Sequence, residues 1–441
     1  MNKSSNKVQV KIYRDTAGHP FPLVVRNGVF PACLYLNAYL NGNHNSPLSE
    51  GKGRNTAQAP AFFTLKKYAY ELKRLYCHFD LNGIDLVKRV ASGEFFSREE
   101  VDGFVRACKF YANQESPQEN SSVTSISDKR IRDAIHATAN SCPQVSTHTF
   151  SQLLIRLRAY IVYLYICHHY DQAPSNQKVK TDDQFNKFTL YINSFISSTR
   201  NNNTITKDAF ESAIPADKFF RLLEIIKESS SDNPFKSSKL RNQIIMQTLI
   251  DSGVRIGALL KLKISDLVDD WGNPRFLITR TPNDPSDTRL DPASNKTKAL
   301  SVSISSDLMK LIKLYISTVR ATYPNVHEHD FVFISEKGQT SGQPLTYKSM
   351  HKIVKKFGYT INLELHPHKL RHKWNEVFED KAKAKGFTPE KIEDLRKYAM
   401  GWVEDSAMAS VYNEFQLAVT VAEISSKNQS KSVPNLRGNH E

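Results

Sequence analysis

The chain has 441 residues, of which 40% are hydrophobic and 24% charged; this is ordinary for a globular protein and predicts two or three domains. No run of about 18 apolar residues and no apolar amino-terminal stretch is present, so the sequence predicts neither a membrane span nor a secretory signal. The five cysteines are widely spaced and odd in number, which argues against a disulfide framework or a zinc knuckle and favours reduced thiols in the cytoplasm. Sixty Lys and Arg against 45 Asp and Glu leave a net charge of +15. Nucleic acid is the usual partner of such an excess, and a merely basic protein is the alternative.

The amino-terminal half divides into three predicted segments. Residues 1–55 form a small separate element with a strand at Val8–Tyr13, either an extra DNA-binding arm or an extension of a DNA clamp formed by the larger domains. Residues 60–170 repeat apolar side chains at helical spacing and predict a helical bundle. The polar composition of residues 171–213 favours a linker with one short helix around Phe185–Ile196.

The carboxy-terminal half predicts a second domain over residues 214–425 and a polar, disordered tail over residues 426–441. Helical periodicity and alternating apolar residues predict the following elements inside it: a helix at Leu240–Ile250 that closes on Ser252-Gly253, strands at Phe276–Thr279 and Leu300–Ile304, a helix at Asp307–Arg320, a strand at Phe331–Ile334 and helices up to Ser425. The fold class is therefore mainly α with a small β-sheet, an α+β protein.

Two motifs of this second domain place arginine where an anion could bind. Arg255 follows the turn at Gly253 and begins the next helix, where its planar fork could bind an anion. By itself, however, this motif fits a surface residue beside a helix cap better. In the segment HPHKLRH, His368 and Arg371 are three residues apart and share a helix face. Arginine neutralises a phosphate and histidine can transfer a proton near neutral pH, although a basic solvated face is an equal reading.

Two further motifs carry a nucleophile and a proton donor. A Tyr412 hydroxyl can attack phosphorus, and the Trp402 indole N–H can donate to a phosphate oxygen. Taken alone, both residues fit core packing better. Between the two strands stands Asn295-Lys296-Thr297-Lys298. A lysine there is either a solvated turn residue or a general acid that reaches a phosphate.

The order of these motifs resembles the tyrosine recombinase (phage integrase) family. SGVRIGALLKLKISDL is similar to the family's first-arginine helix, HPHKLRH to its His-x-x-Arg box, and MGWVEDSAMASVY to its nucleophile segment. Three departures stand out. Ala258 occupies a position where the family usually has a carboxylate, so support for Arg255 must come from elsewhere. Trp402 stands at the second-histidine position, and KAKAKGFTPEK lengthens the segment between Arg371 and Trp402.

The resemblance implies a site-specific DNA recombinase, an integrase of a mobile element, that needs no cofactor, metal or ATP. By this resemblance, Tyr412 forms a 3′-phosphotyrosyl link, and Arg255 and Arg371 bind the non-bridging oxygens. His368 assists proton transfer, and Trp402 supports the phosphate. Lys296 protonates the leaving 5′ oxygen, with Lys298 as second choice. Residues 60–170 are similar to the family's core-binding domain, which would clamp double-stranded DNA at specific recombination sites together with residues 214–425.

The family's partners are expected as well. A homotetramer would hold two paired duplexes in the bacterial cytoplasm, at the nucleoid, with DNA-bending or directionality factors left open. The apolar stripe after Tyr412, from Phe415 to Ile424, would dock into a neighbouring protomer, or else pack on its own domain. Two rivals stay open: a type IB topoisomerase that relaxes DNA, and a non-catalytic DNA-binding protein on the same fold, which Ala258 allows and the intact Arg, His and Tyr set opposes.

Overall fold

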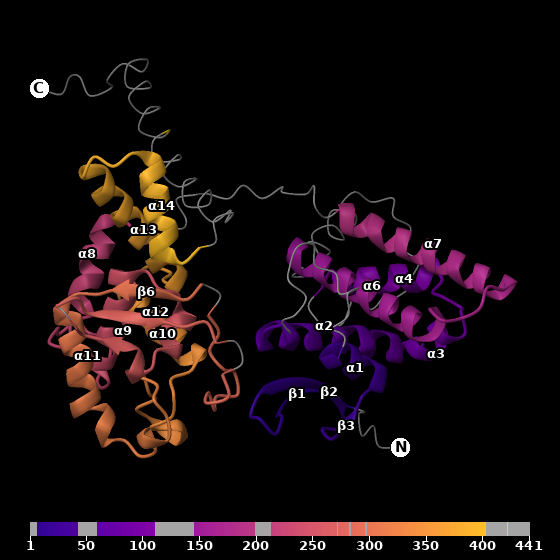
Figure 1. Ribbon diagram of the computed structural model, residues 1–441, viewed down its shortest axis with the longest axis horizontal. Coiled ribbons are helices and arrows are strands. Elements are labelled where there is room, and N and C mark those ends of the chain that lie inside the picture. Colours follow the sequence, from indigo (N-terminus) through magenta and orange to yellow (C-terminus); the bar gives the residue numbers. More distant parts are fainter. Residues whose placement is uncertain are drawn as a thin grey trace, which may run out of the picture. The chain divides into compact units, whose positions relative to one another are not determined.

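The computed structural model describes residues 7–42, 60–110, 145–198, 213–270, 272–281, 284–295, 298–402 and 421. The chain separates into two compact units, Met1–Thr206 and Lys207–Glu441 (Figure 1). Helices dominate both units among the described residues, and each unit holds one three-stranded antiparallel sheet. The predicted α+β class is confirmed.

The first unit starts with a β-hairpin and continues as helices. Its elements are β1 (Val8–Arg14), β2 (Pro20–Arg26), β3 (Phe30–Pro31), α1 (Leu34–Gly42), α2 (Phe62–Leu81), α3 (Leu86–Ala91), α4 (Arg98–Cys108), α6 (Thr147–His169) and α7 (Asn176–Ser198). β1 pairs with β2 in the register Val8↔Arg26, and both strands pack on α2. Val8 and Val24 belong to the same core as the helices, so the described part of residues 1–55 is not a separate element.

α7 changes the predicted boundary between the two halves. We expected a linker over residues 171–213 with a short helix, but α7 runs from Asn176 to Ser198 and packs along α6. Its Phe188, Ile192 and Ile196 are buried in the first core. The predicted helix Phe185–Ile196 covers this apolar stripe but is shorter than α7, because the residues of α7 before Phe185 are mostly polar. The part of the expected linker that α7 occupies therefore belongs to the first unit.

α6 is the central helix of the first unit. By its length and mean hydropathy α6 could cross a membrane. The sequence shows no uninterrupted apolar run there, because Arg156 and Arg158 interrupt it. Its Leu154, Leu157 and Ile161 are fully buried against the other helices. In this structure α6 is thus a core helix.

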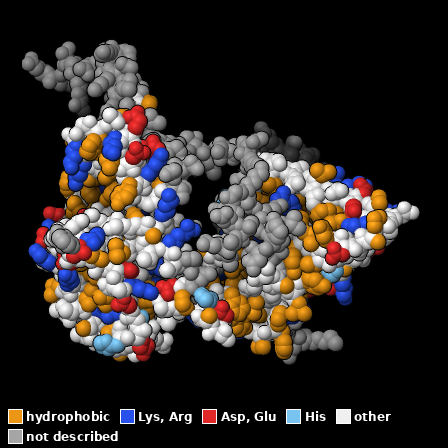
Figure 2. Space-filling view, viewed as in Figure 1, with side chains coloured by type: hydrophobic (Ala, Val, Ile, Leu, Met, Phe, Trp, Pro, Cys, Tyr) orange, Lys and Arg blue, Asp and Glu red, His pale blue; other side chains and the backbone are white. Residues whose placement is uncertain are grey.

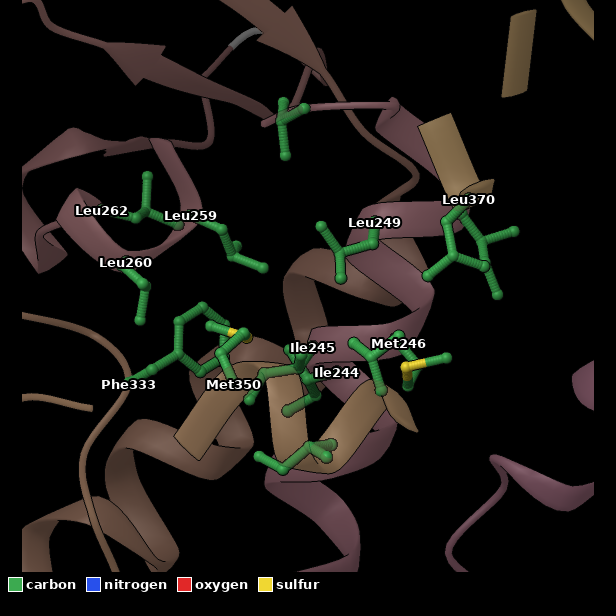
Figure 3. Close-up of a cluster of buried hydrophobic side chains, with 14 of the residues drawn as sticks. Ile244, Ile245, Met246, Leu249, Leu259, Leu260, Leu262, Phe333, Met350 and Leu370 are labelled. Carbon is green, nitrogen blue, oxygen red and sulfur yellow. The ribbon is translucent and has the colours of Figure 1, made fainter. Parts of the chain in front are cut away.

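The second unit surrounds one helix that is buried along most of its length. Its elements are α8 (Ala216–Ile225), α9 (Lys239–Ser252), α10 (Ile256–Lys261), β4 (Leu267–Val268), β5 (Arg275–Ile278), β6 (Leu300–Ser303), α11 (Ser306–Thr318), α12 (Tyr347–Thr360), α13 (Pro367–Ala384) and α14 (Pro389–Met400), with 3-10 turns at Ile264–Asp266, Arg320–Thr322, Val326–Glu328 and Gly338–Thr340. Figure 3 shows side chains of α9 among those of α10, α12 and α13. α9 thereby fixes the positions of the helices that carry the candidate site.

The small sheet of the second unit differs in one strand from the prediction. β5 and β6 pair as expected, with Phe276 opposite Val302, and the two-residue β4 adds a third strand. Phe331–Ile334 is buried, but it makes only isolated bridges, Lys263↔Phe331 and Ile334↔Pro344. An apolar run of four residues fits a core loop as well as a strand, so sequence pattern could not distinguish them.

Candidate active site

Arg255 is positioned by the end of α9. Gly253 caps that helix with φ +59°, and a Cβ on Gly253 would lie 2.8 Å from the Trp374 ring. Glycine is required here for both reasons: the left-handed backbone and the close approach. The chain then extends through Val254, and Arg255 becomes the half-buried N-cap residue of α10. The predicted glycine turn at Gly253 therefore sets where Arg255 lies.

Arg371 joins three segments of the second unit. α13 begins at Pro367, behind the N-cap residue His366, so Arg371 lies in its second turn. The buried guanidinium donates from Nη1 to the Gly253 carbonyl oxygen at 2.6 Å and from Nη2 to the Met400 carbonyl oxygen at 3.4 Å. These bonds bring the end of α9, the start of α13 and the end of α14 together around one side chain.

His368 lies within the electrostatic reach of both arginines. Burial of part of the ring, and then the positive charges of Arg371 and Arg255, hold the pKa of His368 below its ordinary value. The side chain keeps a solvent-exposed edge. At neutral pH the imidazole is therefore uncharged and able to accept a proton, while its exposed edge leaves it accessible.

Trp402 follows the end of α14. Gly401 has φ +61°, and the Trp402 N–H donates to the Lys397 carbonyl oxygen at 3.0 Å, which closes the helix. The indole is buried against Met400 and Trp374. Trp374 in turn donates from Nε1 to the Asp251 carbonyl oxygen at 2.9 Å, so this cluster also fastens α13 to the end of α9.

Lys296 and Tyr412 lie outside the described residues, as does Phe415–Ile424 apart from the exposed Val421. The described residues nearest to Lys296 are Asn295 before it and Lys298 after it. A Cβ on Gly257, two residues beyond Arg255, would lie 2.0 Å from the Ser294 carbonyl oxygen. The Lys298 N–H donates to the Gly401 carbonyl oxygen at 3.2 Å. The structure thus brings the flanks of Lys296 to the segments that carry Arg255 and Trp402.

Sequence reasoning missed the residues that anchor this connection between β5 and β6. The buried Asp287 accepts from Arg289 Nε at 2.7 Å and from the Ala293 N–H at 2.9 Å. Arg289 also donates to the Leu345 carbonyl oxygen at 2.7 Å, ahead of α12. Lys261, at the end of α10, bonds to the Thr281 hydroxyl at 2.5 Å. Polar residues in a loop have no periodicity, so no sequence signal marked them as buried.

A basic cavity of about 470 Å³ lies beside the start of α13. It is lined by Lys348, His351, Lys352 and Lys355 from α12 and by Glu364, Leu365 and His366. Burial lowers the pKa of both histidines. Elsewhere, Lys and Arg side chains are spread over the visible face of the second unit without forming one dominant patch (Figure 2). In the described part of the chain no three His, Cys, Asp or Glu side chains gather in a way that could hold a metal ion.

Several known proteins are similar to this chain. Transposase A from transposon Tn554 of Staphylococcus aureus is 32% identical over 133 residues, which are 30% of this chain and 34% of the transposase. Tyrosine recombinase XerA of Pyrococcus horikoshii is 29% identical over 136 residues, 31% of this chain and 40% of that protein. The chain thus matches about a third of the length of these relatives.

Among solved structures, the XerH site-specific recombinase bound to difH substrate in a pre-cleavage complex has a TM-score of 0.47 at 15% identity, over 82% of this chain and 79% of that one. A lambda integrase (75–356) dimer bound to a COC' core site has a TM-score of 0.41 at 13% identity, over 81% and 90%. Residues 213–382 match the phage integrase family, a range that holds Arg255, Lys296, His368 and Arg371 and ends before Trp402 and Tyr412. Within this second unit, the range that is similar to the phage integrase family thus holds the two arginines and the histidine that lie near the end of α9.

Proposed function

We propose that the protein is a site-specific DNA recombinase that cleaves and rejoins strands through a 3′-phosphotyrosine, as the integrase or transposase of a mobile element. The observation that carries this proposal is the convergence of Arg255, His368 and Arg371 around the Gly253 turn. Two guanidinium forks beside one neutral imidazole form a site suited to a phosphodiester and its growing negative charge.

The proposed reaction consists of two transfers at phosphorus. The Tyr412 oxygen attacks the scissile phosphorus and gives up its proton, which the neutral His368 is suited to accept. The bond to the 5′ oxygen breaks, and Lys296 protonates that oxygen, which leaves a 5′-hydroxyl and a 3′-phosphotyrosine. A 5′-hydroxyl of another strand then attacks the phosphotyrosine and reverses the step. Each transfer exchanges one phosphoester for another, so strand exchange needs no ATP.

Double-stranded DNA is the proposed partner. The lysines of the α12 cavity lie on one helix face, since Lys348, Lys352 and Lys355 follow at four- and three-residue intervals. Such a row suits phosphates along a DNA backbone next to the one bound at Arg371, and the net charge of +15 supports this assignment. We further assign the first unit to the same duplex.

A covalent capture experiment tests the proposal. Purified protein would be incubated with sheared DNA of the organism that carries its gene, denatured, and the DNA fragments attached to it sequenced. We expect attachment at a few sites, through Tyr412. Tyr412→Phe should abolish the adduct, whereas Tyr398→Phe, which removes an exposed hydroxyl from α14, should leave it unchanged.

Each other outcome contradicts a part of the proposal. Absence of an adduct from the unmodified protein overturns the recombinase assignment and leaves the non-catalytic DNA-binding protein. Attachment scattered over many sequences, together with relaxation of a plasmid that lacks a captured site, favours a topoisomerase. An adduct that survives Tyr412→Phe shows that another residue is the nucleophile.

The proposed assembly is a homotetramer on two duplexes, held by exchange of the apolar stripe after Tyr412. Cyclic exchange of one segment links identical protomers and would tie each nucleophile to a neighbour. Truncation after Glu414 should leave binding to one captured site intact and abolish cooperative binding to two. Gel shifts on one-site and two-site DNA measure this, and unchanged cooperativity would favour packing within one protomer.

A further inference from the structure

Ala258 stands where a side chain one turn along α10 could support Arg255. Ala258, one turn further along α10, is buried among the apolar side chains of the second core. The methyl side chain of Ala258 therefore offers neither a charge nor a hydrogen-bond acceptor to Arg255. A guanidinium at a phosphate site must be held in orientation, because an unsupported side chain loses rotamer freedom when it binds.

Tyr347 approaches α10 at the right place. A Cβ on Gly257 would lie only 2.6 Å from the Tyr347 hydroxyl oxygen, so this hydroxyl rests directly on the first turn of α10, two residues beyond Arg255. Any other residue at position 257 would push it away. The contact between α10 and α12 thus depends on glycine at position 257. The Ser294 carbonyl oxygen also lies where a Cβ on Gly257 would be, so its approach needs glycine as well.

The position of Tyr347 is itself fixed by its neighbours. It is the first residue of α12, whose N-cap residue Thr346 accepts from the Ser349 N–H at 3.2 Å. Just before it, the Leu345 carbonyl oxygen accepts from the buried Arg289 at 2.7 Å. The Tyr347 ring stacks on His351 with 6.2 Å between centroids. The hydroxyl is therefore presented to α10 by a rigid helix start.

We propose that Tyr347 is a positioning residue whose hydroxyl orients the Arg255 guanidinium, and that Gly257 makes room for it. This inference rests on the proposed recombinase function. Burial raises the pKa of Tyr347, and the nearby charges of Arg289 and Arg255 lower it in part; the net shift is upward. The phenol therefore keeps its proton at neutral pH. A neutral phenol oxygen can accept from a guanidinium N–H without cancelling the charge that the phosphate needs.

Tyr347→Phe tests the inference, because it removes the hydroxyl and keeps the ring. On a nicked suicide substrate built from a captured site, we expect about tenfold slower cleavage, the effect of losing one hydrogen bond to a charged group. DNA affinity and the thermal midpoint should stay close to those of the unmodified protein. Tyr323→Phe is the matched control, since Tyr323 also packs partly buried against the second core and lies near Arg241 and Glu336; it should cleave normally.

A double-mutant cycle separates positioning from mere packing. If Tyr347 acts through Arg255, Tyr347→Phe should change cleavage less than twofold in an Arg255→Lys background. An equal loss in both backgrounds, or a normal rate for Tyr347→Phe alone, overturns the inference. Failure of the unmodified protein to form any adduct would instead refute the proposed function, so the two failures are distinguishable.

Discussion

Both units bury arginine side chains, and Arg156 of the first unit and Arg371 of the second are held in different ways. In the first unit, Arg156 donates from Nε to Glu71 Oε2 at 3.0 Å and from Nη1 to the Tyr39 hydroxyl at 2.7 Å, and it lies 3.3 Å from the centre of the Tyr68 ring. In the second unit, Arg371 donates to the carbonyl oxygens of Gly253 and Met400. A carboxylate balances a guanidinium charge within the fold, whereas carbonyl dipoles orient it and carry no opposite formal charge. The first arrangement suits structure, and the second suits an anionic ligand.

The largest effect that tests this comparison concerns Arg156. Arg156→Met should destabilise the first unit by about 3–5 kcal/mol, because Glu71 remains buried without its guanidinium partner. Glu71→Met added to it should restore much of the loss. Urea unfolding followed by far-ultraviolet circular dichroism measures this. All three tryptophans lie in the second unit, so their fluorescence should show a nearly unchanged second transition. A loss of unfolding free energy below about 1 kcal/mol would contradict a structural role for the Arg156–Glu71 pair.

Two lysines, one in each unit, allow the same comparison between a structural cation and a proposed catalytic one. Lys178 in the first unit donates to Asp182 at 2.7 Å and to the Tyr165 hydroxyl at 2.6 Å, a structural arrangement. Lys296→Ala, by contrast, should slow cleavage about a hundredfold if this lysine is the general acid. A substrate with a 5′-bridging sulfur should restore the rate, because a thiolate leaves without protonation. Lys178→Ala is the control. Rescue of Lys298→Ala and not of Lys296→Ala would move the role by two residues.

A smaller effect is expected for the phosphate-binding arginines. Arg255→Lys and Arg371→Lys keep the charge and lose the two-pronged fork, so each should slow cleavage at least tenfold, about 1.4 kcal/mol. Arg275→Lys is the control in the same unit, because its guanidinium pairs with Asp270 at the surface. Single-turnover rates on the suicide substrate give the answer. Normal rates in both variants would remove the central feature of the proposed site.

The smallest expected effect is a dependence of stability on pH. Burial, and then the neighbouring His368, His366 and Arg371, lower the pKa of His372 to about 4. The unfolded chain binds this proton near its ordinary pKa of about 6.5, so the contribution of a neutral His372 is complete above that pH and is lost as the pH falls toward about 4. Urea unfolding followed by tryptophan fluorescence at pH 7 and pH 5 should show the loss. His372→Gln should reduce it, and an identical pH dependence in the variant would contradict the assignment.

The sequence by itself determined the local features of this protein, namely the helices and strands with periodic apolar residues and the glycine at a helix end. Helical spacing located α2, α9 and α11, alternation located β5 and β6, and Gly253 marked the end of α9, where its φ is +59°. These features are local, because a helix period or a left-handed turn depends on a few consecutive residues. The motif order was also sufficient to indicate the family.

Only the tertiary structure decided how these parts meet. Arg371 donates to the Gly253 carbonyl oxygen, although 118 residues separate the two. Ser294 and Tyr347 both lie against Gly257. Asp287 and Arg289 are buried as a pair. These contacts depend on segments that are far apart in the chain. The same holds for α7, whose few apolar residues became recognisable as a core face only against α6. Side-chain pairing over such distances has no period and leaves no local trace, since its energy comes from burial and hydrogen bonds that exist only after the helices have packed.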